Sequence, residues 1–267
     1  MTPTKLFPTA RTLVIAVCGM LWAPSVAFAQ TDNWKVDLAP LYFWAATNNG
    51  NLAINRTANI PVYMDFSDAA SKLAGAFSFH GEARRGRWGV IGDVNFIRLS
   101  TDVSFTTPII GAPVAGALEF DQTIFDGKVT FAVKPGTPLF IVGGIRTVTL
   151  SPTATFTGPV GGQLANIDVS TTEVEGVVGF VYRPRLGNKW VLLTQADIGG
   201  GSAFTWSAMG GIEFEIKRWI GVAVAYAALD VDTGSVPTSG INPVNELQYH
   251  VTQYGPAFSL TFHWGGK

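Results

Sequence analysis

The segment Gln253–Trp264, close to the C-terminus, places an apolar side chain at every second position of its second half. Phe258, Leu260, Phe262 and Trp264 alternate there with small or polar residues. Successive side chains of a β-strand point to opposite faces, so a period of two predicts a strand with one aromatic, apolar face and one polar face. A chain built from such strands has to place two chemically different faces in two different environments.

The same alternation recurs along the chain, in long segments separated by turn residues. Most of them exceed the ~5–6 residues of a typical globular strand and reach the ~9–11 residues that a tilted strand needs to cross a bilayer. The nearest approach to a helical pattern is Ser67–Leu73, which begins with a plausible cap. Ten main strands are predicted, namely Trp34–Ala46, Ala74–Arg84, Trp88–Thr101, Leu118–Val133, Leu139–Thr155, Asp168–Tyr182, Trp190–Gly199, Phe204–Ile216, Trp219–Asp232 and Leu247–Trp264.

The connections between these strands alternate between short and long. The short ones are basic: Arg85–Arg87, Lys134–Pro138, Arg183–Lys189 and Lys217–Arg218. The long ones are Thr47–Leu73, Asp102–Ala117, Phe156–Ile167 and Thr233–Glu246. Barrels of the bacterial outer membrane have short periplasmic turns and longer outer loops, so this asymmetry favours a membrane barrel over the ordinary hairpins of a soluble β-protein.

Composition points the same way. Charged residues make up 14% of the chain, against ~25% in ordinary soluble domains, and the mean hydropathy is positive, at +0.27. After the N-terminal region, no apolar run approaches the ~20 residues of a membrane helix. Because only helices and closed barrels satisfy the backbone inside a membrane, the remaining solution is a barrel. The formal net charge of −1 provides no bulk field that would attract nucleic acid.

Alternation alone does not decide which face is inside, because a soluble lipocalin-like barrel has the same period with the faces exchanged. Aromatic residues near strand ends favour lipid on the outside, since membrane barrels carry aromatic girdles at both interfaces. The predicted girdle consists of Trp34, Trp44, Trp88, Trp190, Trp206 and Trp219, together with Trp264 at the end of the last strand.

The polar faces mix acidic and basic residues in the middle of the strands, which suits a lumen better than a solvated surface. An isolated buried ion costs several kcal/mol, so these charges are expected to pair with one another. We therefore predict a salt-bridge network that rigidifies the barrel and blocks free flow through it. Its expected members are Lys35, Asp37, His80, Glu82, Arg84, Asp126, Lys128, Arg146, Glu173, Glu175, Asp197, Glu213 and Glu215.

Residues 1–29 have the pattern of a cleaved secretory signal peptide. Lys5 and Arg11 precede the apolar run Leu13–Trp22, and Ala27–Ala29 forms a small-x-small cleavage site. The run is too short for a transmembrane anchor. The only cysteine, Cys18, lies inside it, so the mature chain is expected to contain no disulfide and no cysteine-based metal or redox site.

Several motifs resemble a family of small proteobacterial outer-membrane β-barrel proteins, whose members commonly show F-S-D, then E-A-R-R-G-R-W-G, then G-D. The matching residues are Phe66–Asp68, Phe79–Gly89 and Gly92–Asp93. Weaker matches follow at Leu118–Gln122, Gly143–Arg146, Asp197–Gly200 and Tyr226–Asp232, while Pro40 and Pro108–Val114 depart from the pattern. The resemblance implies a barrel and an outer-membrane location, and it implies little about activity.

The C-terminal segment also resembles the terminal signal that the barrel-assembly machinery reads on its substrates. Its residues are Gln253, Gly255, Phe258, Leu260, Phe262 and Trp264. The tail Gly265–Lys267 departs from the usual terminal aromatic residue. The resemblance implies a transient partnership with that machinery during biogenesis.

Outer-membrane barrels can be enzymes, and these need a base, usually histidine, near a nucleophile or an acid. His80 is predicted to face the lumen beside Glu82, His250 to lie near the outer end of the last strand, and His263 near its periplasmic end. A lipid A deacylase would require His-x-Ser and a later glutamate, which His250 and Thr252 match only in part. Hydrogen-bonded lumen or rim histidines are the simpler interpretation.

Acidic residues of the outer loops are candidates for divalent cations that bridge lipopolysaccharide, with a solvated loop edge as the simpler alternative. They are Asp65, Asp102, Asp230 and Asp232. No catalytic set, cofactor or resident metal site is predicted.

The sequence therefore predicts an all-β fold for residues 30–267: a transmembrane, antiparallel, up-and-down β-barrel of about ten strands in the outer membrane of a Gram-negative bacterium. Eight and twelve strands remain open, because Asn51–Phe66 either adds a hairpin or folds as a loop. We expect a monomer that contacts outer-membrane lipid and lipopolysaccharide, with a structural or narrow-pore role. The alternatives are a lipid-modifying enzyme and a soluble periplasmic barrel that binds an apolar ligand.

Overall fold

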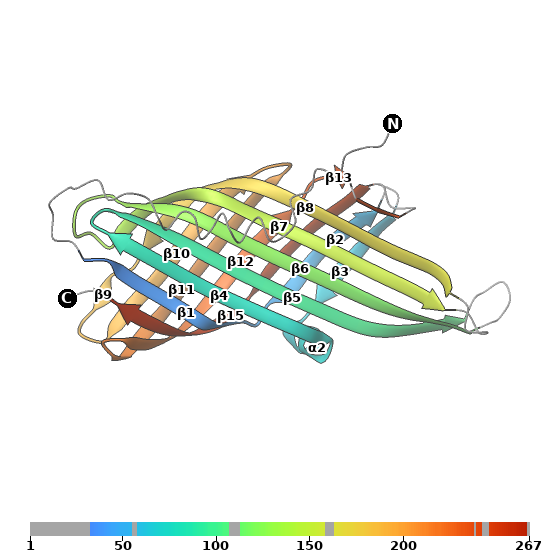
Figure 1. The fold of residues 1–267 in the computed structure, drawn as a ribbon, viewed down its shortest axis with the longest axis horizontal. Coiled ribbons are helices and arrows are strands. Elements are labelled where there is room, and N and C mark those ends of the chain that lie inside the picture. Colours follow the sequence, from blue (N-terminus) through green and yellow to red (C-terminus); the bar gives the residue numbers. More distant parts are fainter. Residues whose placement is uncertain are drawn as a thin grey trace, which may run out of the picture. The chain divides into compact units, whose positions relative to one another are not determined.

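The computed structural model describes residues 33–54, 58–106, 113–157, 163–237, 239–241 and 246–265. The predicted signal peptide, with Cys18, lies outside these residues. Within them, ten antiparallel strands form a closed ring (Figure 1). In ring order the strands are β1 (Lys35–Trp44), β4 (Leu73–Arg85), β5 (Trp88–Thr106), β6 (Pro113–Ala132), β7 (Leu139–Thr157), β8 (Gln163–Tyr182), β10 (Trp190–Gly200), β11 (Phe204–Lys217), β12 (Ile220–Asp232) and β15 (Glu246–Trp264).

The ring closes between its first and last strands. β15 pairs with β1 from Val36–Trp264 to Trp44–Ala257, and β1 pairs with β4 on its other side. Both ends of the described barrel chain therefore lie at the edge that carries the short basic connections, here named the turn end. The opposite edge, which carries the longer connections, is named the loop end. The two-residue strand β9 (Arg185–Leu186) lies within one of the turn-end connections and pairs with β10.

The strands β5 to β8 are longer than the sequence predicted, most of all β5, β6 and β8. β5 and β7 have 19 residues each, and β6 and β8 have 20. Much of the predicted loops Asp102–Ala117 and Phe156–Ile167 is therefore paired strand. At ~3.3 Å per residue these strands extend roughly 60 Å, far beyond a hydrocarbon core of ~30 Å even when tilted. Beyond the lipid, a strand no longer needs an apolar face. The alternation of apolar and polar residues therefore does not predict the outer parts of these strands.

The alternation of short and long connections is broken once. β10 and β11 are joined at the loop end by the short connection Gly201–Ala203. These two strands therefore extend less far toward the loop end than β5 to β8. The connection after β12 covers this gap in the sheet. Its short strand β13 (Val236–Pro237) pairs with β15, and its short strand β14 (Ser239–Ile241) pairs with β8, so the sheet continues beyond the short β10–β11 hairpin.

The segment after β1 forms the hairpin that the sequence left open. β2 (Thr47–Ile54) continues along β15 in the register of β1, and β3 (Ala58–Met64) pairs back onto β2. The short helix α2 (Phe66–Ser71) then leads into β4. Its N-cap is Asp65, whose Oδ1 accepts a hydrogen bond from the backbone of Asp68 at 2.8 Å. In the described part of the chain, no helix has the length and apolar character needed to cross a membrane.

The two faces of the wall have opposite chemistry. Large apolar side chains such as Val129, Ile145 and Val224 are exposed on the outer surface. Charged side chains such as Lys128 and Arg146 are buried in the interior. This is the arrangement of a membrane-spanning barrel, and it is the reverse of the arrangement in a soluble barrel with an apolar lumen.

Aromatic side chains gather on the outer surface at the turn end, each next to a basic residue of a short connection. The ring of Trp88 lies 4.6 Å from that of Phe131, and the Arg87 guanidinium lies 4.2 Å from the centre of the Phe131 ring. Similar groups are Trp190–Phe214 with Lys189, and Trp219–Phe262–Trp264 with Lys217. Rings and cations of this kind suit the boundary between hydrocarbon and headgroups.

Not every tryptophan of the predicted girdle lies on the outer surface. Trp34 is exposed just before β1, and Trp206 lies on the outer face of β11. Trp44 is different: it packs inside the barrel against the apolar cluster described below. The reason is a β-bulge between Leu38 and Leu41, where Pro40 adds a residue and shifts the face on which the later side chains of β1 lie.

Candidate functional site

The interior of the barrel is layered, and the lumen face of β6 shows the order. From the turn end it presents Ala132, then Lys128 and Asp126, and then Ile124 and Phe120. An apolar layer at the turn end is thus followed by a charged layer and then by an apolar half at the loop end. The turn-end layer consists of Ile91, Ala132, Phe140, Val142 and Val181.

The centre of the charged layer is a cluster of two cations and three carboxylates. Arg146 lies 3.0 Å from Asp126 and 2.8 Å from Asp197. Lys128 lies 2.8 Å from Asp197 and 3.4 Å from Asp126. Glu175 lies 4.0 Å from Arg146. The strands β6, β7, β8 and β10 are successive in the ring. These ion pairs therefore cross the lumen and link the inner faces of four strands.

Gly199, which has no side chain, makes room for the carboxylate of Glu175. The hydroxyl of Thr205 donates a hydrogen bond to its carboxylate. Gly199 lies beside this contact, and a Cβ at that position would come within 2.5 Å of the Glu175 carboxylate. The glycine therefore allows this close approach of the carboxylate to the wall, and a larger residue would force the Glu175 carboxylate to shift.

A second group of ion pairs joins the strands at the closure of the ring. Asp37 on β1 bonds to Arg84 at 3.0 Å and to Nδ1 of His263 at 2.8 Å. Nε2 of the same histidine lies 2.7 Å from Glu213 on β11. His263 therefore bridges two carboxylates from strands on either side of β15.

Arg183 enters this group from the connection after β8. Its guanidinium donates to Glu82, which also lies 2.9 Å from Arg84. Burial lowers the pKa of Arg183, but the carboxylates of Glu82 and Asp37 outweigh that effect and raise its pKa above the ordinary value. The guanidinium therefore stays charged. In the sequence this arginine belongs to the short basic connection Arg183–Lys189, and no local signal marks it as a lumen residue.

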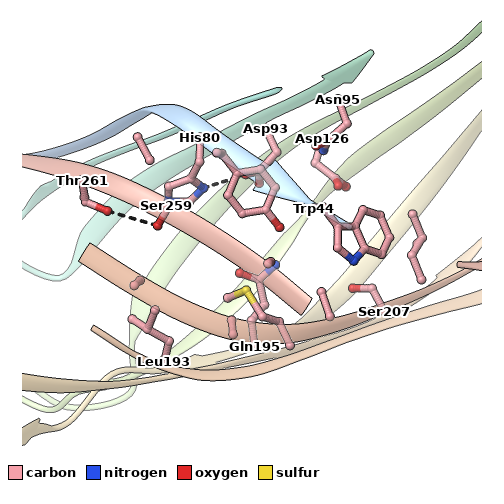
Figure 2. A pocket seen from close by; sticks show the side chains of 18 of the residues that line it. Trp44, His80, Asp93, Asn95, Asp126, Leu193, Gln195, Ser207, Ser259 and Thr261 are labelled. Atoms are coloured by element: carbon pink, nitrogen blue, oxygen red, sulfur yellow. Dashed lines mark hydrogen bonds and ion pairs between the residues drawn. The ribbon is translucent and has the colours of Figure 1, made fainter. Parts of the chain in front are cut away.

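A small cavity of about 150 Å³ lies within the charged layer. Figure 2 shows His80 and Asp93 bonded to each other at its edge, with His80 Nδ1 2.6 Å from the carboxylate. Asp93 was not predicted as a network member. Its position in the alternation of β5, on the same face as Ile91 and Asn95, would have identified it.

Three of the predicted network members lie outside these ion-pair groups. Lys35 is exposed at the turn end. Glu215 forms a bidentate ion pair with Arg185 of the β8–β10 connection, with 2.6 Å between guanidinium nitrogen and carboxylate oxygen in each contact. Glu173 accepts a hydrogen bond from the backbone of Ser202 at the short loop-end connection. The remaining ten of the thirteen predicted residues form the ion pairs described above.

The loop-end half of the lumen is apolar. Its buried cluster consists of Ile124, Val148, Leu150, Leu229, Val231, Tyr249 and Val251, and Trp44, Val62 and Phe120 pack against it. A cavity of about 720 Å³, here named the chamber, adjoins this cluster. Polar side chains line it where it approaches the charged layer: Gln253 donates 2.8 Å hydrogen bonds to both Gln122 and Asn48.

The loop-end acids and His250 do not form a catalytic arrangement. The Thr252 hydroxyl donates to Asp230 at 2.6 Å, and His250 lies 3.5 Å from the same carboxylate. The hydroxyl is therefore bonded to the acid and not to the histidine that would have to activate it. Asp232 accepts from the backbone of Gly234 at 2.8 Å. Within the described ranges no group of three or more His, Cys, Asp or Glu side chains is placed to hold a metal.

No protein-family model matches the sequence, and no curated protein does. Solved structures with a similar fold include the translocator domain of the autotransporter NalP from Neisseria meningitidis, with a TM-score of 0.47, 11% identity, and coverage of 94% of this chain and 93% of that chain. The outer membrane protease OmpT from Escherichia coli has a TM-score of 0.41 and 10% identity, and the match covers 90% of this chain and 99% of that chain. The CymD monoaromatic hydrocarbon channel has a TM-score of 0.33 and 11% identity, and the match covers 93% of this chain and 92% of that chain. With TM-scores below 0.5, these similarities carry no conclusion about function.

Proposed function

We propose that this chain is an outer-membrane barrel with a sealed lumen, which acts as a structural component of the envelope and not as an open pore. The observation that carries the proposal is the cluster of Arg146, Lys128, Asp126 and Asp197. Arg146 is only 1% exposed, and Lys128 and Asp197 are 3% exposed. An open aqueous channel would leave such side chains hydrated.

The turn end corresponds to the periplasmic side in this proposal, and the loop end to the outside. The basic residues and aromatic rings of the turn end support this orientation, since short connections are typically periplasmic. The apolar outer surface would contact lipid, and the strands that extend beyond the membrane would reach the lipopolysaccharide layer. The terminal strand β15, which pairs with β1 to close the ring, would carry the signal for the assembly machinery.

A catalytic role has weaker support. His80 and His263 are bonded to carboxylates within the ion-pair layer. His250 lies beside Asp230, whose carboxylate already accepts the Thr252 hydroxyl. None of these arrangements gives a nucleophile and its base in contact, which hydrolysis or acyl transfer would require.

Two measurements test the proposal. The full-length chain would be expressed and fractionated, and its gel mobility compared with and without boiling. We expect a heat-dependent shift in the outer-membrane fraction, as a closed barrel resists detergent until it is heated. Purified protein in planar bilayers should then show no sustained ion conductance.

The matched variant for conductance is the double substitution K128A/R146A, which removes both cations of the cluster. It leaves three carboxylates without a cationic partner from the cluster, so water and cations should enter and produce a cation-selective leak. The exposed substitution Arg185→Ala is the control and should remain closed. A large conductance in the wild-type protein would contradict the sealed lumen, and recovery in the soluble periplasm would contradict the membrane location.

A further inference from the structure

The wall of the barrel contains a seam where two neighbouring strands separate. β1 and β4 pair from Lys35–Arg84 only as far as Ala39–His80. Beyond this point β1 continues to pair with β15, and β4 continues to pair with β5. Pairing on this side of the sheet resumes only where β2 meets β3, at Asn48–Met64. The interrupted stretch of β1 starts at Pro40, which has no backbone N–H to donate.

The seam lies at the depth of the apolar outer surface. The outward-facing side chains that flank it are Leu41 and Phe43 on β1 and Phe77 on β4, and all three are exposed. Unpaired backbone groups are costly within the hydrocarbon region, and are tolerated where they are covered by protein or line a cavity. An interruption here is therefore not a neutral irregularity of the sheet.

The chamber passes through the seam. Its lining includes interior residues such as Ile124 and Tyr249, and also Phe43 and Phe77, which face outward. The same cavity is thus bordered by the buried cluster at one side and by the lipid-facing surface at the other. An apolar cavity of about 150 Å³ is enough to bind benzene, and the chamber measures about 720 Å³.

Helix α2 covers the seam from outside. Phe66, its first residue, packs edge-to-face on Phe43 of β1, with ring centroids 5.7 Å apart. Ala69 and Ala70 of the same helix line the chamber. Phe66 also lines the chamber, but the alanines in the middle of the helix leave open space behind them.

The inner part of the chamber holds polar atoms that have no partner among the described residues. They are Nε1 of Trp44, Nε2 of Gln122 and Oδ1 of Asn95, all buried and all on residues that line the chamber. Gln122 itself is only 3% exposed. A buried donor or acceptor without a partner costs ~1–3 kcal/mol. A ligand with one hydrogen-bonding group at its inner end would satisfy at least one of these atoms.

We propose that the chamber is a binding site for a hydrocarbon-chain molecule, which enters laterally through the seam between β1 and β4. The chain lies against the apolar cluster, and a single polar group meets the buried polar atoms: a hydroxyl accepts from Gln122 or Trp44 or donates to Asn95, and a carbonyl accepts from Gln122 or Trp44. The ion-pair layer below prevents passage to the turn end, so the site holds its ligand and does not conduct it. The ligand is either an acyl chain of the surrounding lipid or a free hydrocarbon dissolved in the membrane.

Trp44 provides the test, because bromine atoms quench indole emission on contact. The full mature protein would be reconstituted in phosphatidylcholine vesicles, and the emission of Trp44 obtained by subtracting that of a Trp44→Phe variant. In one arm the acyl chains of the lipid are brominated. In the other the lipid is unbrominated and 1-bromododecane is added. Trp44 faces the interior, so its quenching requires a chain inside the chamber.

Ala76→Phe fills the chamber near the seam, and Ala74→Phe is the matched control on the same strand. Both alanines are exposed, but Ala76 lines the chamber and Ala74 does not. We expect saturable quenching in the wild type and in Ala74→Phe, and at least a fivefold loss of it in Ala76→Phe. Heat-dependent gel mobility, unchanged in all variants, would show that each barrel has folded.

Each outcome is decisive. Quenching by brominated lipid alone identifies an acyl chain of the bilayer as the occupant, and quenching only by 1-bromododecane identifies a free hydrocarbon. Quenching of the outer tryptophans with none of Trp44 in either arm would overturn the proposal. Equal quenching in Ala76→Phe and the wild type would overturn it as well. These results are independent of the sealed lumen, which is tested by ion conductance.

Discussion

Arg146 on β7 and Asp197 on β10 meet inside the barrel, with Nη2 of the arginine 2.8 Å from the carboxylate, although β8 lies between their strands. Both side chains are buried. Their contact spans three neighbouring strands, β7, β8 and β10, and lies inside the lumen. In the sealed barrel that we propose, rigidity and closure depend on the same residues.

Removing Arg146 should be strongly destabilising. Arg146→Ala leaves Lys128 as the only cation for Asp126, Asp197 and Glu175, and loss of one partner of a buried pair costs ~3–5 kcal/mol. Urea unfolding of the protein in lipid vesicles, followed by gel mobility, would measure the loss. The control is Arg185→Ala, which removes an arginine of similar geometry that is exposed and pairs with Glu215. That change should cost less than ~1 kcal/mol, and equal effects of the two changes would contradict the network.

Gly144 should not tolerate a side chain. A Cβ at this position would lie 2.0 Å from the carbonyl oxygen of Gly127, whereas a Cβ at Gly143 would lie 3.8 Å from its nearest neighbour. Gly144→Ala should therefore cost ~1–3 kcal/mol through overpacking against the backbone, and Gly143→Ala should be close to neutral. Comparison of the folded fraction after refolding into vesicles would test this, and a neutral Gly144→Ala would show that the strands can separate.

The cap of α2 should control local order without affecting the barrel. Asp65→Ala removes the carboxylate that accepts from the backbone of Asp68, a loss typically worth ~0.5–2 kcal/mol of helix stability. Limited proteolysis should cleave the Met64–Leu73 region faster in this variant, while the heat-dependent mobility stays unchanged. Ser67→Ala, two residues later, is the matched control. Loss of the mobility shift in Asp65→Ala would mean that the helix supports the wall as well as covering the seam.

His250→Ala should leave lipid hydrolysis at the background level of the wild type. The reason is geometric: the hydroxyl of Thr252, two residues further along β15, donates to Asp230. Release of fatty acid from phospholipid or lipid A vesicles, measured with and without calcium, would check this. Calcium-dependent hydrolysis by the wild type that disappears in His250→Ala would support an enzymatic role and contradict our proposal.

The period-two pattern was sufficient to locate the ten strands of the ring, since alternation is a local property of the backbone. It also identified the charged face, because charged residues such as Lys128 and Asp126 appear every second position. It misplaced Trp44, because one extra residue at Pro40 exchanges the faces and leaves no mark in the pattern downstream. It also underestimated β5 to β8, whose outer parts lie beyond the lipid and need no apolar face.

The sequence by itself determined the class of fold, the apolar and charged faces, and most residues of the ion-pair layer. Only the tertiary structure decided which charges meet, because partners such as Arg146 and Asp197 are set by the order of strands around the ring and by their register. The same holds for Arg183, which folds into the lumen from a connection. The seam and the chamber also arise only in three dimensions, since they depend on where β1 leaves β4 to follow β15.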